Sequence, residues 1–203
     1  MDSGNIGFVL LCAAFVFVMT PGLAMFYGGL VRKKNVVNTM MTSIFIIGVG
    51  IVMWVLFGYS LSFAPSGNAF IGDFRWLGLE GVSLTEGYTD DASIPNMVFS
   101  AFPMMFAVIT PALITGAVAG RMKFKSIFVF TIFWSLIVYY PLAHMVWGQG
   151  GLLGADGIGA LDFAGGDVVH ISSGVSALVL CILLGKRHDY EHSIYRIHNI
   201  PTV

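Results

Sequence analysis

Three ionisable side chains fall within nine positions of an otherwise apolar and small-residue stretch: Asp162, Asp167 and His170. A charged side chain at the centre of a bilayer costs about 2.5–3.5 kcal/mol on insertion scales, so such residues point to function. A neutral imidazole can donate and accept hydrogen bonds, and its ordinary pKa suits it to carry protons. The chemistry that this cluster suggests is attraction of a cation and movement of a proton.

Each member of the cluster has a plain structural role beside the functional one. Asp162 precedes the Gly165-Gly166 pair, where it could cap a helix and also supply a negative potential that attracts cations. His170 lines a pathway or is a core histidine bonded to a neighbouring helix. The roles of Asp167 and of His144, which lies in another apolar stretch, stay open.

Aromatic side chains form a second arrangement of interest. Phe102 and Phe106 are four residues apart and share a helix face. Trp147 ends an apolar stretch, where tryptophan is usually part of an interfacial belt. The alternative for Trp147 is a cation held over its ring, an interaction worth about 0.5–2 kcal/mol.

The composition decides the setting of these residues. Of the 203 residues, 57% are hydrophobic and 10% are charged, and the net charge is −1. Soluble domains carry about 25% charged residues. These values exclude a soluble enzyme, a disordered chain and a nucleic-acid binder with a basic surface, and they predict an all-α polytopic membrane protein.

Five stretches have the roughly 20 apolar residues that a helix needs to cross a bilayer. We expect spans at about residues 6–30, 40–63, 95–119, 126–147 and 165–185. The loop at 64–94 is long and rich in glycine, serine and acidic residues. Cys12 and Cys181 lie inside apolar stretches, without the spacing of a metal site.

The charges sort by side of the membrane. Nine of the ten basic residues fall in three segments that five spans place on one side, and that side is cytoplasmic by the positive-inside rule. The N-terminus is then outside and residue 203 inside. The basic segments contain Arg32, Lys33, Lys34, Arg121, Lys123, Lys125, Lys186, Arg187 and Arg196. The opposite side holds Arg75 and the acids Asp73, Glu80, Glu86, Asp90, Asp91, Asp156 and Asp162.

Five spans with the N-terminus outside and the C-terminus inside match one half of an inverted-repeat transporter. In 198–203, Asn199 suits an N-cap and Pro201 a first helical turn. We therefore expect residues 1–203 to be a single, incomplete membrane domain, in which 186–203 is a cytoplasmic loop that leads to a missing sixth helix.

Several motifs in order along the chain resemble the ammonium transporter family (Amt/Mep/Rh), and within it the microbial Amt branch. They are Met19–Asn35, Phe102–Thr110, His144–Gly148 and, most specific, Asp-Phe-Ala-Gly-Gly-Asp-Val-Val-His at 162–170. The resemblance implies eleven helices in two inverted five-helix halves, of which this chain is the first. It further implies a homotrimer in the plasma membrane with one pore in each subunit.

The resemblance also implies residue roles. Trp147 and Phe102 would recruit ammonium at the outer side, and Phe106 would form half of the aromatic gate below them. His170 would be the first of two pore histidines, and Asp162 would act through structure and field. The substrate would be ammonium or ammonia, with methylammonium as a further candidate, and a PII-class protein would regulate the cytoplasmic face. No cofactor, metal or catalytic residue is expected.

Two other classes compete with transport. A membrane hydrolase could use Asp162, His170 and Ser172 or Ser173, but all four come from one helical stretch and no GxSxG turn is present. A truncated subunit that senses ammonium, or assembles with complete subunits without transporting, is the stronger alternative. The residues do not distinguish electrogenic ammonium transport from ammonia conduction.

Overall fold

The computed structural model describes residues 1–89, 92–155, 157–187, 190–191 and 196–203, and its elements are all helical. Asp90, Asp91 and Asp156, expected on the outer side, lie outside the described residues. Five helical spans are long and apolar enough to cross a membrane, as predicted: Ser3–Leu30, Lys33–Phe63, Asn96–Val118, Phe124–Trp147 and Gly166–Leu184. Their shortest member, at 19 residues, is about 28 Å long and so matches the hydrocarbon core of a bilayer.

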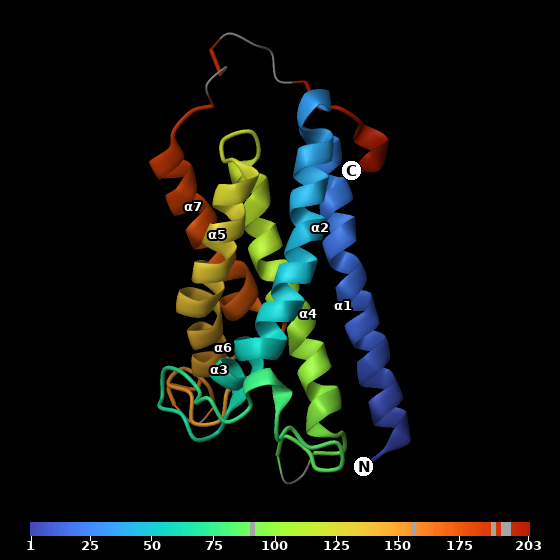
Figure 1. The fold of residues 1–203 in the computed structure, drawn as a ribbon, viewed down its shortest axis with the longest axis vertical. Coiled ribbons are helices and arrows are strands. Elements are labelled where there is room, and N and C mark those ends of the chain that lie inside the picture. Colours follow the sequence, from blue (N-terminus) through green and yellow to red (C-terminus); the bar gives the residue numbers. More distant parts are fainter. Residues whose placement is uncertain (90–91, 156, 188–189, 192–195) are drawn as a thin grey trace.

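Figure 1 shows these spans as a bundle with long loops at one end. The first span is the single helix α1 (Ser3–Leu30), which runs through Pro21, and the third is α4 (Asn96–Val118). The other three each join an α-helix to a π-type turn. The second contains η1 (Lys33–Asn35), α2 (Val36–Met53), η2 (Trp54–Gly58) and α3 (Tyr59–Phe63); the fourth contains α5 (Phe124–Trp134), η4 (Ser135–Tyr139) and α6 (Tyr140–Trp147); the fifth contains η5 (Gly166–Ile171) and α7 (Ser172–Leu184). Two short 3-10 turns lie elsewhere, η3 (Leu77–Leu79) and η6 (Ile200–Thr202).

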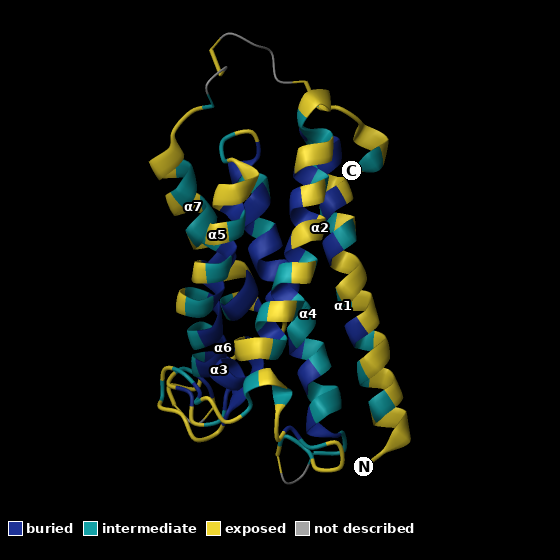
Figure 2. Ribbon diagram, viewed as in Figure 1, coloured by how far each residue is buried: buried dark blue, intermediate teal, exposed yellow. Residues whose placement is uncertain are grey.

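Helix α4 is the centre of the bundle and packs against α1, α2 and α7. Half of its most apolar window is buried, against 11% of that of α1. Figure 2 shows this contrast as dark blue on α4 and yellow on α1. Outward apolar side chains suit a lipid environment, where helices associate through close packing rather than hydrophobic exclusion from water.

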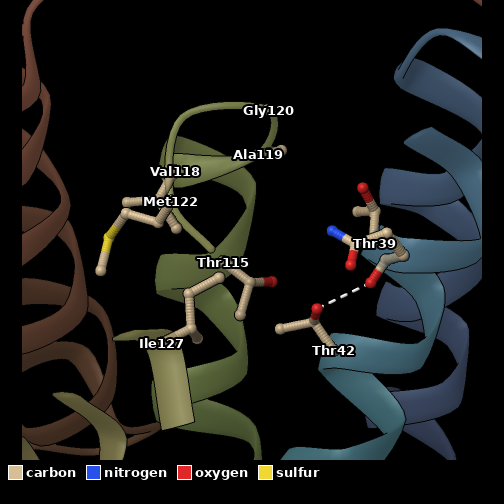
Figure 3. A pocket seen from close by; sticks show the side chains of 9 residues that line it. Thr39, Thr42, Thr115, Val118, Ala119, Gly120, Met122 and Ile127 are labelled. Carbon is tan, nitrogen blue, oxygen red and sulfur yellow. Dashed lines mark hydrogen bonds between the residues drawn. The ribbon is translucent and has the colours of Figure 1, made fainter. Parts of the chain in front are cut away.

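Small residues let α4 approach its neighbours. A Cβ at Gly116 would come within 2.5 Å of the Tyr27 ring, whose hydroxyl donates to the Leu113 carbonyl at 2.9 Å. Hydroxyl groups join α4 to α2 in the same region, where Ser43 Oγ and Thr115 Oγ1 are 3.3 Å apart. Figure 3 shows the small cavity beside them, with Thr42 next to the backbone carbonyl that accepts its hydroxyl.

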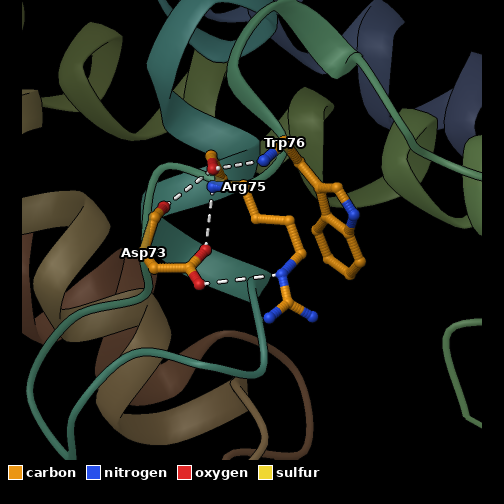
Figure 4. A network of polar contacts seen from close by, with 4 residues as sticks. Asp73, Arg75 and Trp76 are labelled. Atoms are coloured by element: carbon orange, nitrogen blue, oxygen red, sulfur yellow. Dashed lines mark hydrogen bonds and ion pairs between the residues drawn. The ribbon is translucent and has the colours of Figure 1, made fainter.

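The long loop that follows the second span, which we call the outer loop after the side predicted from the charges, is tied to the end of that span. Ser60 Oγ donates to the Asp73 carbonyl at 2.7 Å and accepts from the Trp76 backbone N–H at 2.9 Å. The Trp76 ring stacks on Tyr59, with centroids 5.4 Å apart. Arg75 lies 3.8 Å from the Asp73 carboxylate in an exposed ion pair (Figure 4), which contributes little stability. These contacts hold residues 73–76 of the loop against the end of the second span.

The last described residues form only a short 3-10 turn. Asn199 occupies the N-cap position, as expected, but its side chain makes no capping hydrogen bond. Its backbone N–H instead donates to the Gly29 carbonyl at 3.1 Å. The segment at 196–203 thus contacts the end of α1 on the side of the basic segments.

We predict that Gly116→Val destabilises the protein by about 1–3 kcal/mol, because the new side chain overpacks against Tyr27. Thermal unfolding in detergent measures the loss. Gly22→Val is the matched control, because a Cβ at this exposed α1 position meets no atom within 4 Å. Equal stability of the two variants would contradict the close approach of α1 and α4.

Candidate functional site

A cavity of about 530 Å³ opens at the end of the bundle that the charges predict to face outward, where α4 begins, α6 ends and the fifth span begins. Most of its lining is aromatic and only one lining residue is ionisable. The lining residues are Phe63, Phe99, Phe102, Pro103, Phe106, Trp147, Asp162, Phe163, Ala164 and Gly165. We call this cavity the outer vestibule.

The outer vestibule brings together four of the five residues to which the family resemblance assigns a role. Phe102 and Phe106 lie on one face of α4, with ring centroids 5.1 Å apart and planes at 84°. Trp147, the last residue of α6, meets Phe106 at 6.1 Å and 63°. Asp162 comes from the segment before η5. The Trp147 ring is therefore part of an enclosed aromatic cluster as well as the end of a span.

Asp162 holds the start of the fifth span. Its Oδ2 accepts from the backbone N–H groups of Asp167 (3.2 Å) and Val168 (3.0 Å). Its Oδ1 is buried and has no hydrogen-bond partner among the described residues. One oxygen of the carboxylate thus fixes the backbone, and the other leaves a hydrogen-bond acceptor unused at the vestibule.

The fifth span starts at Gly166, four residues after Asp162 and close to the expected start at residue 165. Residues 161–165 are irregular, and Gly165 adopts a left-handed φ of +78° just before η5 begins. A non-glycine residue is disfavoured there by its Cβ. His170 is therefore about 6 Å along the helix axis from Gly166, the first residue of η5.

His170 does not line the outer vestibule. It lies in η5, where its backbone N–H donates to the Gly165 carbonyl at 3.0 Å, and it is exposed. The opposite face of the fifth span is buried and packs on α4 and the fourth span, where Trp134 Nε1 donates to Ser176 Oγ at 2.8 Å. His170 opens the exposed face, which continues through Gly174, Val175, Leu178 and Ile182.

The hydroxyls of Ser172 and Ser173, considered for a hydrolase, are used inside their own helix. Ser172 donates to the Val168 carbonyl, and Ser173 donates to the Val169 carbonyl at 2.6 Å. Both serines are buried, whereas His170 is exposed. This arrangement does not place either hydroxyl as a nucleophile next to the histidine.

His144 is buried one turn before Trp147 and fixes the outer loop to α6. Its Nδ1 lies 3.1 Å from the Ser62 carbonyl oxygen and its Nε2 lies 2.8 Å from that of Asn68. Gly148 packs against this ring, since a Cβ there would lie 2.6 Å from Nδ1. The sequence left the role of His144 open, and the contacts are those of a positioning residue for the end of α6.

A second set of hydrogen bonds from the outer loop holds Gln149, two residues after Trp147. The backbone N–H of Gln149 donates to the Tyr88 hydroxyl at 3.1 Å, and its side-chain amide donates to the Tyr88 carbonyl at 3.0 Å. The Tyr88 ring stacks on Phe99, with centroids 4.9 Å apart. Burial raises the pKa of Tyr88, and the N–H from Gln149 partly offsets this effect.

Sequence reasoning missed three aromatic members of the vestibule. Phe99 precedes Phe102 by three residues, so helical spacing alone could have placed it on the same face. Phe163 follows Asp162 directly in the sequence, and its side chain is fully exposed in the structure of residues 1–203. Phe63, at the end of α3, carries no signal in the sequence, because only the fold brings it to the edges of Tyr88 and Phe99.

The fold and the vestibule define a multi-pass, all-helical membrane protein with an aromatic outer site. The sequence model of the Ammonium Transporter Family matches residues 7–203. The ammonium transporter of Bacillus subtilis is 53% identical over 189 residues, which cover 93% of this chain and 46% of the relative. The chain belongs to the ammonium transporter family, and it spans about half the length of the curated relatives it matches.

Solved structures agree on the fold. Mep2 of Candida albicans superposes with a TM-score of 0.86 at 32% identity, over 100% of this chain and 44% of that chain. A structure described as a sensor Amt protein superposes with a TM-score of 0.83 at 26% identity, over 98% of this chain and 49% of that chain. The expected fold, five helices that form one half of the Amt/Mep architecture, is confirmed.

Asp162→Ala should destabilise the fold by about 0.5–2 kcal/mol, the range for loss of a helix-capping acceptor, because two backbone N–H groups lose their partner. Asp162→Asn keeps one oxygen acceptor and should lose less. Thermal unfolding in detergent compares the two variants. If asparagine proved as destabilising as alanine, the capping account of Asp162 would be wrong.

Tyr88 should make stability fall at alkaline pH. Because the pKa of Tyr88 is raised in the folded protein, the unfolded chain loses the hydroxyl proton first, near the ordinary pKa of about 10. The contribution of Tyr88 to the free energy of unfolding is therefore constant below about pH 10 and declines above it. The difference in unfolding free energy between wild type and Tyr88→Phe should therefore be flat at pH 7–9 and shrink above pH 10. Chemical denaturation at each pH measures it, and a gap that widens above pH 10 would contradict the sign.

Proposed function

We propose that the protein moves ammonium or ammonia across the cell membrane, with the outer vestibule as the recruitment site. The observation that carries this proposal is the convergence of Phe102, Phe106, Trp147 and Asp162 on one cavity in a chain of the ammonium transporter family. The relatives are named ammonium transporters, which supports transport rather than enzymatic chemistry.

Recruitment of ammonium would use the faces of the aromatic rings in the vestibule. A bare ammonium ion loses its hydration on entering an apolar cavity, and aromatic faces offset part of that loss through cation–π attraction. Trp147 binds a cation best among the aromatic residues, and its neighbour Phe106 meets it nearly edge to face. Phe102 completes the cluster from one turn nearer the outer end of α4.

Asp162 would attract the cation through the electric field of its carboxylate. The carboxylate lines the vestibule while it holds the start of the fifth span, so its negative charge stays at the place where a cation enters. Its role is the attraction of ammonium over neutral molecules of similar size.

Phe106 and His170 would separate the cation from the interior. A charge is costly in the hydrocarbon layer, so a narrow aromatic gate at Phe106 favours loss of a proton before passage. His170 lies deeper along the fifth span and can donate and accept hydrogen bonds to the neutral molecule or carry the proton. Whether charge or ammonia crosses depends on where this proton goes.

The exposed face of η5 and α7 would be covered in the working protein. It presents His170 together with Val175, Leu178 and Ile182, a combination unsuited to lipid at the histidine and to water elsewhere. We propose that the second five-helix half of the family architecture packs here and completes an eleven-helix pore. The protein would form homotrimers, with a PII-class protein as the regulatory partner of the cytoplasmic face.

The orientation follows from the charges. The basic residues at 32–34, 121–125 and 186–187 lie at the opposite end of the bundle from the vestibule, which is close to acidic residues. By the positive-inside rule the vestibule faces outward from the plasma membrane, and residue 203 lies on the cytoplasmic side.

Ammonium sensing is the second candidate function. It is favoured by the likeness to the structure described as a sensor Amt protein. A sensor would bind ammonium at the same vestibule without net uptake. A transporter and a sensor would therefore both bind ammonium at the vestibule, but only the transporter would show net ammonium uptake.

Trp147→Leu should raise the ammonium concentration for half-maximal uptake by about 2- to 30-fold, the equivalent of the 0.5–2 kcal/mol of a cation–π contact. The measurement is uptake or current in proteoliposomes that contain the protein expressed from its complete gene. Phe74→Leu is the control, because this exposed loop phenylalanine is not among the vestibule residues.

An unchanged half-maximal concentration in Trp147→Leu would contradict recruitment at the vestibule. If correctly assembled wild-type protein binds ammonium but shows neither uptake nor current, sensing would replace transport as the proposed function.

A further inference from the structure

Helix α4 contains two prolines within its length, Pro103 and Pro111. Proline has no backbone N–H, so the carbonyl four residues earlier loses its usual helical partner. The two carbonyls concerned are those of Phe99 and Ala107. An unpaired carbonyl is costly in hydrocarbon, and proline is tolerated in membrane helices where a neighbouring helix, a side chain, water or a local change of helix geometry satisfies the carbonyl.

The two prolines differ in their surroundings. Phe99 and Pro103 both line the outer vestibule. Ala107 and Pro111 lie about 12 Å further along the helix and do not line it. A carbonyl that has lost its partner to a proline lies against the pyrrolidine ring, because the ring stands where the N–H would be. The Phe99 carbonyl oxygen therefore lies at the wall of the vestibule and points inward along α4, as helical carbonyls point toward the C-terminal end.

The polar groups beside Phe99 on α4 are already used within the protein. The next carbonyl, that of Ser100, accepts from Trp54 Nε1 of the second span at 3.2 Å. The Ser100 hydroxyl donates to the Met97 carbonyl at 2.7 Å. No side chain among the described residues donates to the Phe99 carbonyl. This oxygen therefore remains available to a hydrogen-bond donor that enters the vestibule.

The side chains of the outer vestibule supply almost no hydrogen-bond acceptor. Nine of the ten lining residues have aromatic or aliphatic side chains or are glycine, and the indole N–H of Trp147 only donates. The tenth, Asp162, has Oδ2 bound to the backbone and Oδ1 buried. Aromatic ring faces attract a cation by its charge but accept only weak hydrogen bonds from N–H groups. A backbone carbonyl is therefore the group that can recognise the N–H bonds of ammonium.

We propose that the backbone carbonyl of Phe99, which Pro103 leaves without a helical partner, accepts a hydrogen bond from ammonium in the outer vestibule. This inference rests on the proposed function of the vestibule and adds to it a specific ligand atom. The rings of Phe102 and Trp147 attract the charge, and the carbonyl oxygen binds one N–H group of the same ion. Pro103 is a positioning residue, because it acts through the backbone group that it leaves unpaired.

The test restores the missing N–H. Pro103→Val supplies a backbone N–H to the Phe99 carbonyl and keeps an apolar side chain of similar volume, and Pro103→Ala supplies the same N–H with a smaller side chain. Isothermal titration calorimetry measures the affinity for ammonium chloride of the protein expressed from its complete gene and purified in detergent. Both variants should bind ammonium at least about threefold more weakly than wild type, as expected for the loss of one hydrogen bond.

Pro111→Ala is the matched control, because it restores an N–H within the same helix at a position that does not line the vestibule. Its ammonium affinity should equal that of wild type. Wild-type affinity in Pro103→Val would overturn the carbonyl as a ligand. An equal loss in Pro111→Ala would overturn it as well, since the cause would then be a general change in α4. A loss confined to Pro103→Ala would assign the effect to side-chain volume and would also overturn it.

The calorimetric test is independent of the uptake measurement that tests transport, because it records binding without flux. If wild type binds ammonium, the Pro103 variants bind it more weakly and no protein takes up ammonium, the carbonyl ligand stands and transport fails. If wild type takes up ammonium and the Pro103 variants bind it as wild type does, transport stands and the carbonyl ligand fails. A wild-type protein that binds no ammonium would overturn the carbonyl ligand.

Discussion

The cost of placing charged or unpaired polar groups in hydrocarbon is the constraint on which the rest of this structure depends. It requires backbone hydrogen bonds to close within each span, and the spans accordingly are helices that continue through their π-type turns. Hydroxyl groups in the bundle follow the same rule. Thr42 and Ser173, for example, donate to carbonyls four residues earlier in their own helices. The ionisable residues that remain are therefore conspicuous, and two of them, Asp162 and His170, lie on the path proposed for the substrate.

The same constraint explains the design of the outer vestibule. Its walls are rings from three helical spans, and its one ionisable residue among those described is Asp162, one of whose two oxygens is committed to the backbone. The outer loop is held to the end of α6 on both sides of Trp147: His144 precedes it and contacts the Ser62 carbonyl, and Gln149 follows it and donates to Tyr88. In the function proposed here, a cation would meet aromatic faces and a fixed field before it meets hydrocarbon. This order of contacts would suit a site that attracts ammonium and then removes its charge.

The spans could be predicted from the sequence because their signal is local. Twenty apolar residues between charged segments have one stable arrangement in a bilayer, and the expected start and end of each span differ by only a few residues from those observed, except that the second begins at Lys33 rather than Met40. Phe102, Phe106 and Trp147 could be named from spacing, position and family resemblance. Phe63 could not, because its place at the vestibule depends on long-range packing against Tyr88 and Phe99. Nor could the irregular conformation of residues 161–165, just before η5.

The central claim is that the aromatic vestibule serves a pathway for ammonium or ammonia rather than a binding site alone. The most direct measurement is the uptake of isotopically labelled ammonium into proteoliposomes that hold the protein expressed from its complete gene. The account predicts uptake that saturates with ammonium concentration and exceeds that of protein-free vesicles. Uptake equal to that of protein-free vesicles, with the protein verified as folded and inserted, would contradict it.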